Sequence, residues 1–247
     1  MGEYEQNANT IMGQPFDVVA GMKNGFGNVA ALRFIQEWTH RTATSVLAIR
    51  SRFTTGVGIL GATVNSIPGT ADGQFSSWQG QLQWMKQFET TGIEVWNLLT
   101  AQLSDDRLFP LEQMSVGGRY SVRGYRENTL LRDNGVIYQF ETRFPLWSSS
   151  TGFPYVQFCP FADVGHSWSA KGEDIGGVHT LASVGAGFRF NFSALTNLNV
   201  YWGRRLVTAN VPNPHNSMQD EGCIYSSCST FGSGKRRLLV GKPTLLP

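Results

Sequence analysis

The sequence has little charge, no long hydrophobic run and few cysteines. Charged residues make up 15% of its 247 positions, well below the ~25% of an average soluble domain. The formal net charge of +2 excludes a polybasic nucleic-acid binder as the default. An aromatic content of 12% excludes an acidic disordered chain. No apolar stretch approaches the ~18 residues of a membrane-spanning helix, so a helical membrane protein is excluded as well.

The short motifs of common enzymes are also missing. The sequence contains no H-E-x-x-H, no G-x-S-x-G and no phosphate-binding G-x-x-x-x-G-K-[ST]. His166 lies near Asp163 and Ser167, but neighbours along one strand alternate between its two faces and rarely form a triad. Cysteine is too sparse for a disulfide framework or a zinc site; the three are Cys159, Cys223 and Cys228. We therefore predict no catalytic residue, no cofactor and no metal.

The first residues, MGEYEQNANTIMG, are acidic and polar. They lack the basic n-region and the apolar h-region of a secretory signal peptide, so none is predicted. Together with the strand pattern described next, this start leads us to expect that the chain is the C-terminal part of a longer protein.

Period-two alternation of apolar and polar residues is the strongest positive signal, and it predicts β-strands. It is clearest over 78–88, 136–146 and 181–193. One face of these strands is aromatic, with Trp78, Trp84, Tyr138, Phe140, Phe188 and Phe190. The other face carries polar and charged side chains, among them Gln79, Gln81, Gln83, Gln139, Glu141, Arg143 and Arg189.

The length of these runs points to a membrane. They are about twice as long as the ~5–6 residues of a soluble strand, and they match the ~9–11 residues of a tilted strand that crosses a bilayer. Their polar face suits a wet lumen better than a dry core. The sequence therefore predicts an all-β, antiparallel transmembrane β-barrel, with the polar face lining a pore and the aromatic face meeting lipid.

Weaker strand signals extend this pattern in both directions. They cover 31–41, 44–55, 92–103, 155–165 and 196–206, with a further one around 16–26.

Residues 105–135 interrupt the strands with a long connection whose centre reads SVGGRYSVRGY. A connection of this length inside a compact domain usually has a function. We expect it to be folded, with Tyr120 and Tyr125 partly buried against the barrel wall. The alternative is an ordinary mobile extracellular loop.

The alternation ends near residue 222. An outer-membrane barrel normally closes with an alternating strand that ends on an aromatic residue, whereas residues 223–247 read CIYSSCSTFGSGKRRLLVGKPTLLP. Suitable codons for GCIYSSCSTF, read one base later, can spell GVFIQVVQLF, which alternates well. We therefore expect 1–222 to be the barrel portion and 223–247 to be an aberrant, frameshifted tail, a hypothesis that the coding DNA decides.

Two short motifs identify a family. Val122-Arg123-Gly124-Tyr125 resembles the V-R-G-[FY] signature of two-partner-secretion outer-membrane translocators, the haemolysin-activator type of transporter. Phe161-Ala162-Asp163-Val164-Gly165 resembles the second signature of that family, F-x-D-x-G. The two motifs stand in the family's order, about 35–40 residues apart.

This resemblance implies that the chain is the C-terminal part of a sixteen-stranded barrel. In the family, two periplasmic POTRA domains and a plug helix precede the barrel, and we expect none of them in this chain. The resemblance also implies that the 105–135 loop folds back into the lumen. It assigns a loop-locking and gating role to Val122, Arg123, Gly124, Tyr125, Phe161, Asp163 and Gly165, while the pore would be lined by Gln139, Glu141, Arg143 and Arg189.

The function implied by the resemblance is export of a large, unfolded haemolysin- or haemagglutinin-like exoprotein across the bacterial outer membrane. Folding of that partner outside would drive transport, without nucleotide or metal. The POTRA domains would recognise the partner, and the translocator would act in the lipid bilayer as a monomer, without nucleic acid. A barrel-assembly insertase of the same superfamily, a passive porin-like or adhesin barrel, and an outer-membrane hydrolase stay open as alternatives.

The alternation over 155–165 places Asp163 on the lumenal face, because the opposite set, which includes Ala162 and Val164, is apolar. A carboxylate in a confined lumen favours a cationic partner, and the planar guanidinium of Arg123 can hold it with two hydrogen bonds. We therefore predict a direct contact between Arg123 and Asp163, against the alternative of two separately solvated charges.

Overall fold

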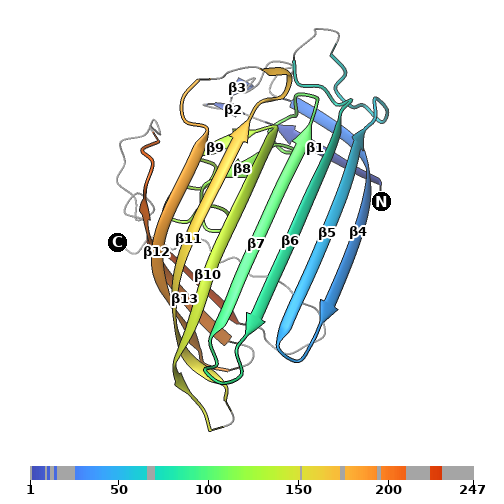
Figure 1. The fold of residues 1–247 in the computed structure, drawn as a ribbon. Helices are drawn as coiled ribbons and strands as arrows, with labels where there is room; N and C mark the ends of the chain where they lie inside the picture. The colour runs from blue at the N-terminus through green and yellow to red at the C-terminus, as the bar shows by residue number, and fades with distance from the viewer. Residues whose placement is uncertain are drawn as a thin grey trace.

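The computed structural model describes residues 2–8, 10–11, 14–15, 26–65, 70–150, 152–172, 176–193, 196–209 and 223–229. Its main element is one antiparallel sheet that curves and whose strands are tilted, as in an incomplete barrel (Figure 1). In spatial order the ten strands are β1 (Gly2–Ala8), β4 (Phe26–Arg41), β5 (Ser45–Gly56), β6 (Ser76–Gln87), β7 (Glu94–Ser104), β10 (Asn134–Ser148), β11 (Pro154–Trp168), β12 (Thr180–Asn191), β13 (Thr196–Arg205) and β14 (Cys223–Ser229).

The remaining elements are short. Two small hairpins are formed by β2 (Thr10–Ile11) with β3 (Gln14–Pro15), and by β8 (Met114–Val116) with β9 (Leu130–Arg132). A single 3-10 turn, η1, covers Ala170–Gly172. Within the described ranges, no helix has the length and apolar character needed to cross a membrane.

The predicted strands between residues 31 and 206 are confirmed, with ends that differ by a few residues. The largest difference is in β4, which begins at Phe26 rather than at 31. The signal around 16–26 falls on residues 16–25, which lie outside the described residues, and on the first residue of β4.

Two strands of the sheet have no alternating sequence. The polar segment Gly2–Ala8 pairs with the start of β4, and Cys223–Ser229, from the segment predicted to be an aberrant tail, pairs with β13. Strand pairing uses backbone N–H and C=O groups, so a segment without a suitable side-chain pattern can still extend a sheet. The frameshift origin of residues 223–247 stays a prediction.

The two faces of the sheet have different side chains, as the alternation predicted. Along β10, Tyr138 and Phe140 are 40% and 36% exposed, whereas Gln139 and Glu141 between them are 4% and 2% exposed. In β12, Phe188 lies on the exposed outer face and Arg189 on the inner, concave face. The aromatic face therefore points outward over the central strands, and the polar face points into the concave side.

Short and long connections alternate along the chain. The links at 42–44, 88–93, 149–153 and 192–195 are short, whereas those at 57–75, 105–133 and 169–179 are long. These four short links lie at one end of the sheet and the three long ones at the other (Figure 1).

Apolar packing is concentrated on the concave side, in two clusters. The first joins the start of β4 to two of the long connections and contains Val29, Ala31, Ala71, Phe75, Leu108 and Phe109. The second joins the 105–135 connection to β10 and β12 and contains Met114, Val116, Val122, Tyr125, Leu130, Ile137 and Leu181. Both clusters fix long connections against the inner wall.

Candidate functional site

The 105–135 loop is a folded structure on the concave side of the sheet. Its hairpin, β8 with β9, lies behind β7 and β10 in the view of Figure 1. Val116 and Val122 are fully buried there, and burial of a valine side chain contributes about 1.5–3 kcal/mol. The prediction of a folded loop is confirmed.

Gly165, the last residue of the F-x-D-x-G segment, makes room for this loop. A Cβ at Gly165 would lie 2.5 Å from Val116 Cγ1 and 3.0 Å from Val122 Cγ2. A larger residue would therefore push the loop away from β11.

Arg123 is held by Asp163 through three hydrogen bonds. Its backbone N–H and its Nε both donate to Asp163 Oδ2, at 3.0 and 2.8 Å, and its Nη2 donates to Oδ1 at 2.8 Å. Arg123 is 5% exposed and Asp163 3%. The predicted direct contact is present, and the alternative of separately solvated charges is wrong for this structure.

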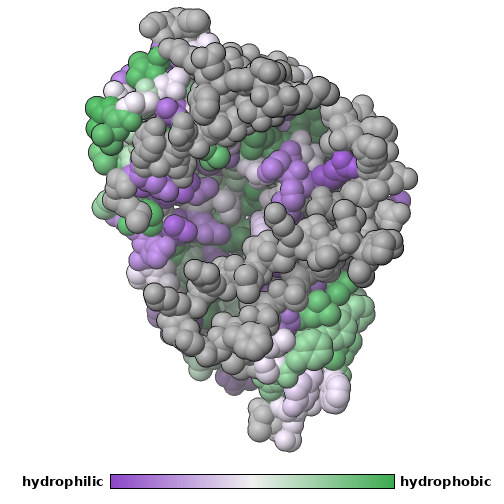
Figure 2. All heavy atoms as spheres, turned by 180° about the vertical axis from the view of Figure 1, so that it is seen from behind, coloured by the Kyte–Doolittle hydropathy of each residue, from purple (hydrophilic) through white to green (hydrophobic). Residues whose placement is uncertain are grey.

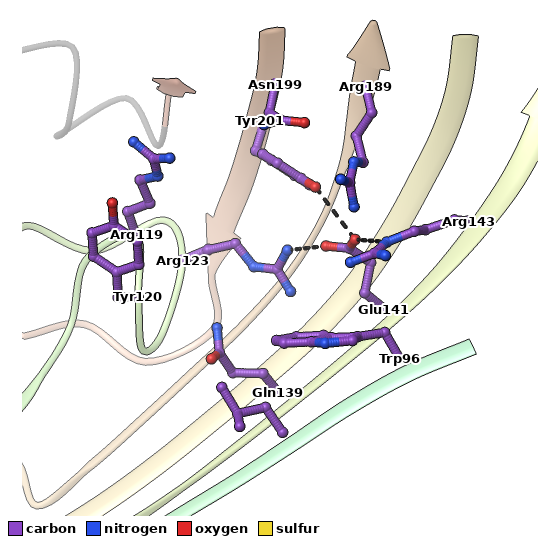
Figure 3. A pocket seen from close by; sticks show the side chains of 11 residues that line it. Trp96, Arg119, Tyr120, Arg123, Gln139, Glu141, Arg143, Arg189, Asn199 and Tyr201 are labelled. Carbon is purple, nitrogen blue, oxygen red and sulfur yellow. Dashed lines mark hydrogen bonds and ion pairs between the residues drawn. The ribbon is translucent and has the colours of Figure 1, made fainter. Parts of the chain in front are cut away.

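A second carboxylate, Glu141 on β10, also holds Arg123. Glu141 Oε2 accepts a hydrogen bond from Arg123 Nη1, while its Oε1 accepts from Arg143 Nε at 2.7 Å. The Tyr201 hydroxyl donates to the same oxygen at 3.3 Å, and Arg143 continues the network to Glu94. Glu141 and Arg143 were expected only to line the pore. The network shows that Glu141 also holds Arg123 directly and that Arg143 contacts the same carboxylate (Figure 3).

Two aromatic rings cover the Arg123 guanidinium. Its central carbon lies 3.8 Å from the ring centroid of Phe161 and 5.2 Å from that of Tyr201. Burial opposes the charge on Arg123, but the hydrogen bonds and charges of Asp163 and Glu141 outweigh it and raise the pKa of Arg123 above its ordinary value. Arg123 therefore stays a cation in the loop at any physiological pH.

Tyr125 attaches the loop to the next pair of strands. Its hydroxyl lies 2.8 Å from the carbonyl oxygens of Ala182 and Val207 and accepts a hydrogen bond from the Val207 N–H at 3.1 Å. Tyr125 is 2% exposed, whereas Tyr120 is 67% exposed. The burial prediction is therefore confirmed for Tyr125 and wrong for Tyr120. The ring of Tyr120 lies beside the Arg119 guanidinium, and both residues border a cavity on the concave side.

The base of the loop has its own attachment, which the sequence did not indicate. Glu112 accepts a hydrogen bond from Arg33 on β4, and both side chains are buried. Asp133, at the other end of the loop, accepts hydrogen bonds from the backbone N–H groups of Leu108 and Ala170, each at 2.9 Å. The base of the loop is thus fixed to β4, whereas its tip, which carries Arg123 and Tyr125, is fixed to β10, β11 and β12.

The predicted pore-lining residues share the concave face. Gln139, Glu141, Arg143 and Arg189 surround one cavity, together with residues of the loop and of β13 (Figure 3). From the concave side, hydrophilic side chains gather in the uncovered parts of the hollow (Figure 2). His166 is exposed on the opposite face from Asp163 and Ser167, so these three do not meet.

A family model decides the identity of this arrangement. The model described as "Haemolysin secretion/activation protein ShlB/FhaC/HecB" matches residues 25–190, which include both signature segments, the loop and the strands from β4 to β11. The chain belongs to this family. The resemblance inferred from Val122–Tyr125 and Phe161–Gly165 is confirmed.

Two solved structures show the same fold as this chain. CdiB from Escherichia coli aligns with a TM-score of 0.65 and 21% identity over 83% of this chain and 37% of its own. CdiB from Acinetobacter baumannii aligns with a TM-score of 0.57 and 18% identity over 81% of this chain and 32% of its own. The chain thus spans about a third of these structures. No curated protein sequence matches it.

Proposed function

We propose that this protein exports a secreted exoprotein partner across the bacterial outer membrane by two-partner secretion, with the 105–135 loop as its gate. The observation that carries the proposal is the buried Arg123, which ties the loop to Asp163 and Glu141 on two strands of the inner wall. Membership of a secretion family, rather than an enzyme family, supports transport over catalysis.

The connections suggest the orientation of the sheet. Outer-membrane barrels have short turns on the periplasmic side and longer loops on the extracellular side. The long connections at 57–75, 105–133 and 169–179 would then be extracellular. In this orientation the gate loop enters the lumen from outside and lies across the path of an exported chain.

The charge network gives the gate a closed state. Removing one partner of a buried ion pair costs about 3–5 kcal/mol because it leaves an uncompensated charge. Opening the loop would break the contacts of Arg123 with Asp163 and with Glu141 at the same time. The closed arrangement is therefore favoured until another partner or water replaces both contacts. Val122, Gly124, Tyr125, Phe161 and Gly165 would act in the same gate by shaping the contact between loop and wall.

The test is a charge swap in the protein expressed from its own gene together with the exoprotein gene. Single changes Arg123→Asp and Asp163→Arg should each reduce the exoprotein in the culture medium, and the double change should restore part of it. Outer-membrane levels of each variant are measured alongside, so that loss of assembly is separated from loss of transport. If the double variant secretes no better than either single one, and Asp163→Ala secretes normally, the gate assignment is wrong.

A further inference from the structure

A cavity of about 260 Å³ beside the gate has an excess of positive charge. Four arginines line it, namely Arg119, Arg123, Arg143 and Arg189, and Glu141 is the carboxylate in the same lining. Two further carboxylates, Asp163 and Glu94, pair with Arg123 and Arg143 from outside the lining. We call it the arginine cavity. It opens on the concave side of the sheet, between the loop on one side and β12 and β13 on the other (Figure 3).

Only two of the four arginines are used by the gate. Arg123 and Arg143 both contact Glu141. In the described part of the chain, the guanidinium groups of Arg119 and Arg189 form no ion pair; Glu127 accepts a hydrogen bond from the Arg119 backbone N–H only. The Nε of Arg189 is buried without a hydrogen-bond partner. A buried cationic donor without a partner, such as Arg189 Nε, favours an anionic ligand that can accept its hydrogen bond.

The size and the lining of the cavity indicate which kind of anion fits. Its volume is below the ~300–1,000 Å³ of a typical small-molecule site, which leaves room for one or two side chains. The rings of Trp96 and Tyr120 and the amide of Gln139 line the same space, and they can contact the apolar and amide groups of a peptide. A bare inorganic ion would leave these groups unused.

We propose that the arginine cavity binds Asp or Glu side chains of an extended polypeptide in the lumen. The identity of that polypeptide as the exported partner rests on the proposed function; the binding of acidic side chains does not. Arg119 belongs to the loop and Arg189 to β12, so an acidic segment bound across the cavity contacts both the gate and the wall. Acidic segments of a partner would therefore bind where they can act on the gate.

Binding is measured by fluorescence anisotropy, with the purified protein in detergent micelles and a fluorescein-labelled hexaglutamate peptide. We expect hexaglutamate to bind, hexaglutamine to bind at least tenfold more weakly, and Arg119→Gln and Arg189→Gln each to weaken hexaglutamate binding about tenfold. Arg50→Gln is the matched control, because Arg50 lies on the same face of the sheet but pairs with Glu37 outside the cavity. It should change the affinity less than twofold.

Two results would overturn the inference. One is unchanged hexaglutamate affinity in both Arg119→Gln and Arg189→Gln. The other concerns competition for the labelled peptide. If inorganic phosphate, at the same total charge, competes as effectively as unlabelled hexaglutamate does, the cavity is a small-anion site.

Secretion by the wild type, measured beside peptide binding by the variants, separates this inference from the proposed function. Absence of secretion by the wild type, with arginine-dependent peptide binding intact, contradicts the export proposal and supports the cavity. Normal secretion by the wild type, with peptide binding independent of both arginines, contradicts the cavity alone.

Discussion

Gly124 and Gly203 lie so close together that neither has room for a side chain. A Cβ at Gly124 would lie 2.7 Å from the carbonyl oxygen of Gly203, and one at Gly203 would lie 3.1 Å from the Gly124 Cα. Gly124 also has φ of +92°, a conformation that costs other residues about 1–2 kcal/mol. The gate loop thus contacts β13 backbone to backbone, immediately after Arg123.

The first prediction is that Gly124→Ala loosens the gate. The added methyl group has to displace either the loop or β13, so trypsin should cleave after Arg123, which is buried in the native structure, at least tenfold faster. Gly152→Ala is the control, since Gly152 has a similar φ of +82° but open space around its Cβ position. If both variants resist trypsin equally, the close contact with Gly203 does not hold the loop.

A second prediction concerns the hydroxyl of Tyr125. Tyr125→Phe leaves the Val207 N–H and the carbonyl of Ala182 without this partner, which should cost about 1–3 kcal/mol. Thermal unfolding of the purified protein, followed by circular dichroism, measures the effect. Tyr120→Phe, at an exposed ring, should leave the midpoint unchanged; an equal shift in both variants would show that the buried hydroxyl has no special importance.

The base of the loop should respond separately from its tip. Glu112→Gln weakens the contact with Arg33, which then retains its contact with the more exposed Glu3, at a cost of about 1.5–3 kcal/mol. Hydrogen exchange should therefore increase over residues 108–113 and remain slow over 122–125. The matched control is Glu37→Gln, because the Glu37–Arg50 pair is exposed and such pairs contribute little. Equal acceleration at base and tip would contradict two independent attachments.

The orientation of the sheet is tested by two adjacent residues of β6. Leu82 lies on the outer face and is 38% exposed, while Gln83 lies on the inner face. Leu82→Arg places a charge against lipid, at a cost of about 2–4 kcal/mol near the bilayer midplane, and should reduce the amount of protein in the outer membrane. Gln83→Arg should assemble normally, because its side chain meets the hydrated lumen. The reverse result would contradict the assignment of the two faces.

Periodicity was sufficient to predict the central strands and their faces. It placed Asp163 and Glu141 on the inner wall because successive side chains in a strand point to opposite sides. It could not show that Glu141 reaches Arg123, since the face of a residue says nothing about which loop packs against it. The contact between Arg33 and Glu112, 79 residues apart, is equally invisible to local pattern.

The loop itself shows why irregular segments are harder to predict. Tyr120 and Tyr125 belong to the same eleven-residue stretch, SVGGRYSVRGY, and have the same side chain, yet only Tyr125 is buried. The difference comes from the backbone path between Gly118 and Gly124, both with positive φ, which no strand or helix period describes. One signal in the sequence could have predicted a close-packed aromatic side chain, namely the glycines on the inner face of β12. Tyr201 occupies the space beside Gly187 on that face.

Attachment of one loop at two distant points links the two sides of the concave face. Glu112 fastens the loop to β4, and Arg123 and Tyr125 fasten it to β10, β11 and β12. While both attachments hold, the strands on the two sides of the concave face cannot move apart by more than the short chain segment between them allows. Release of Arg123 and Tyr125 together would free that end of the loop, while Glu112 keeps the loop within reach of its original position. A loop attached in this way would return to the same position after its tip is released, because its base stays in place.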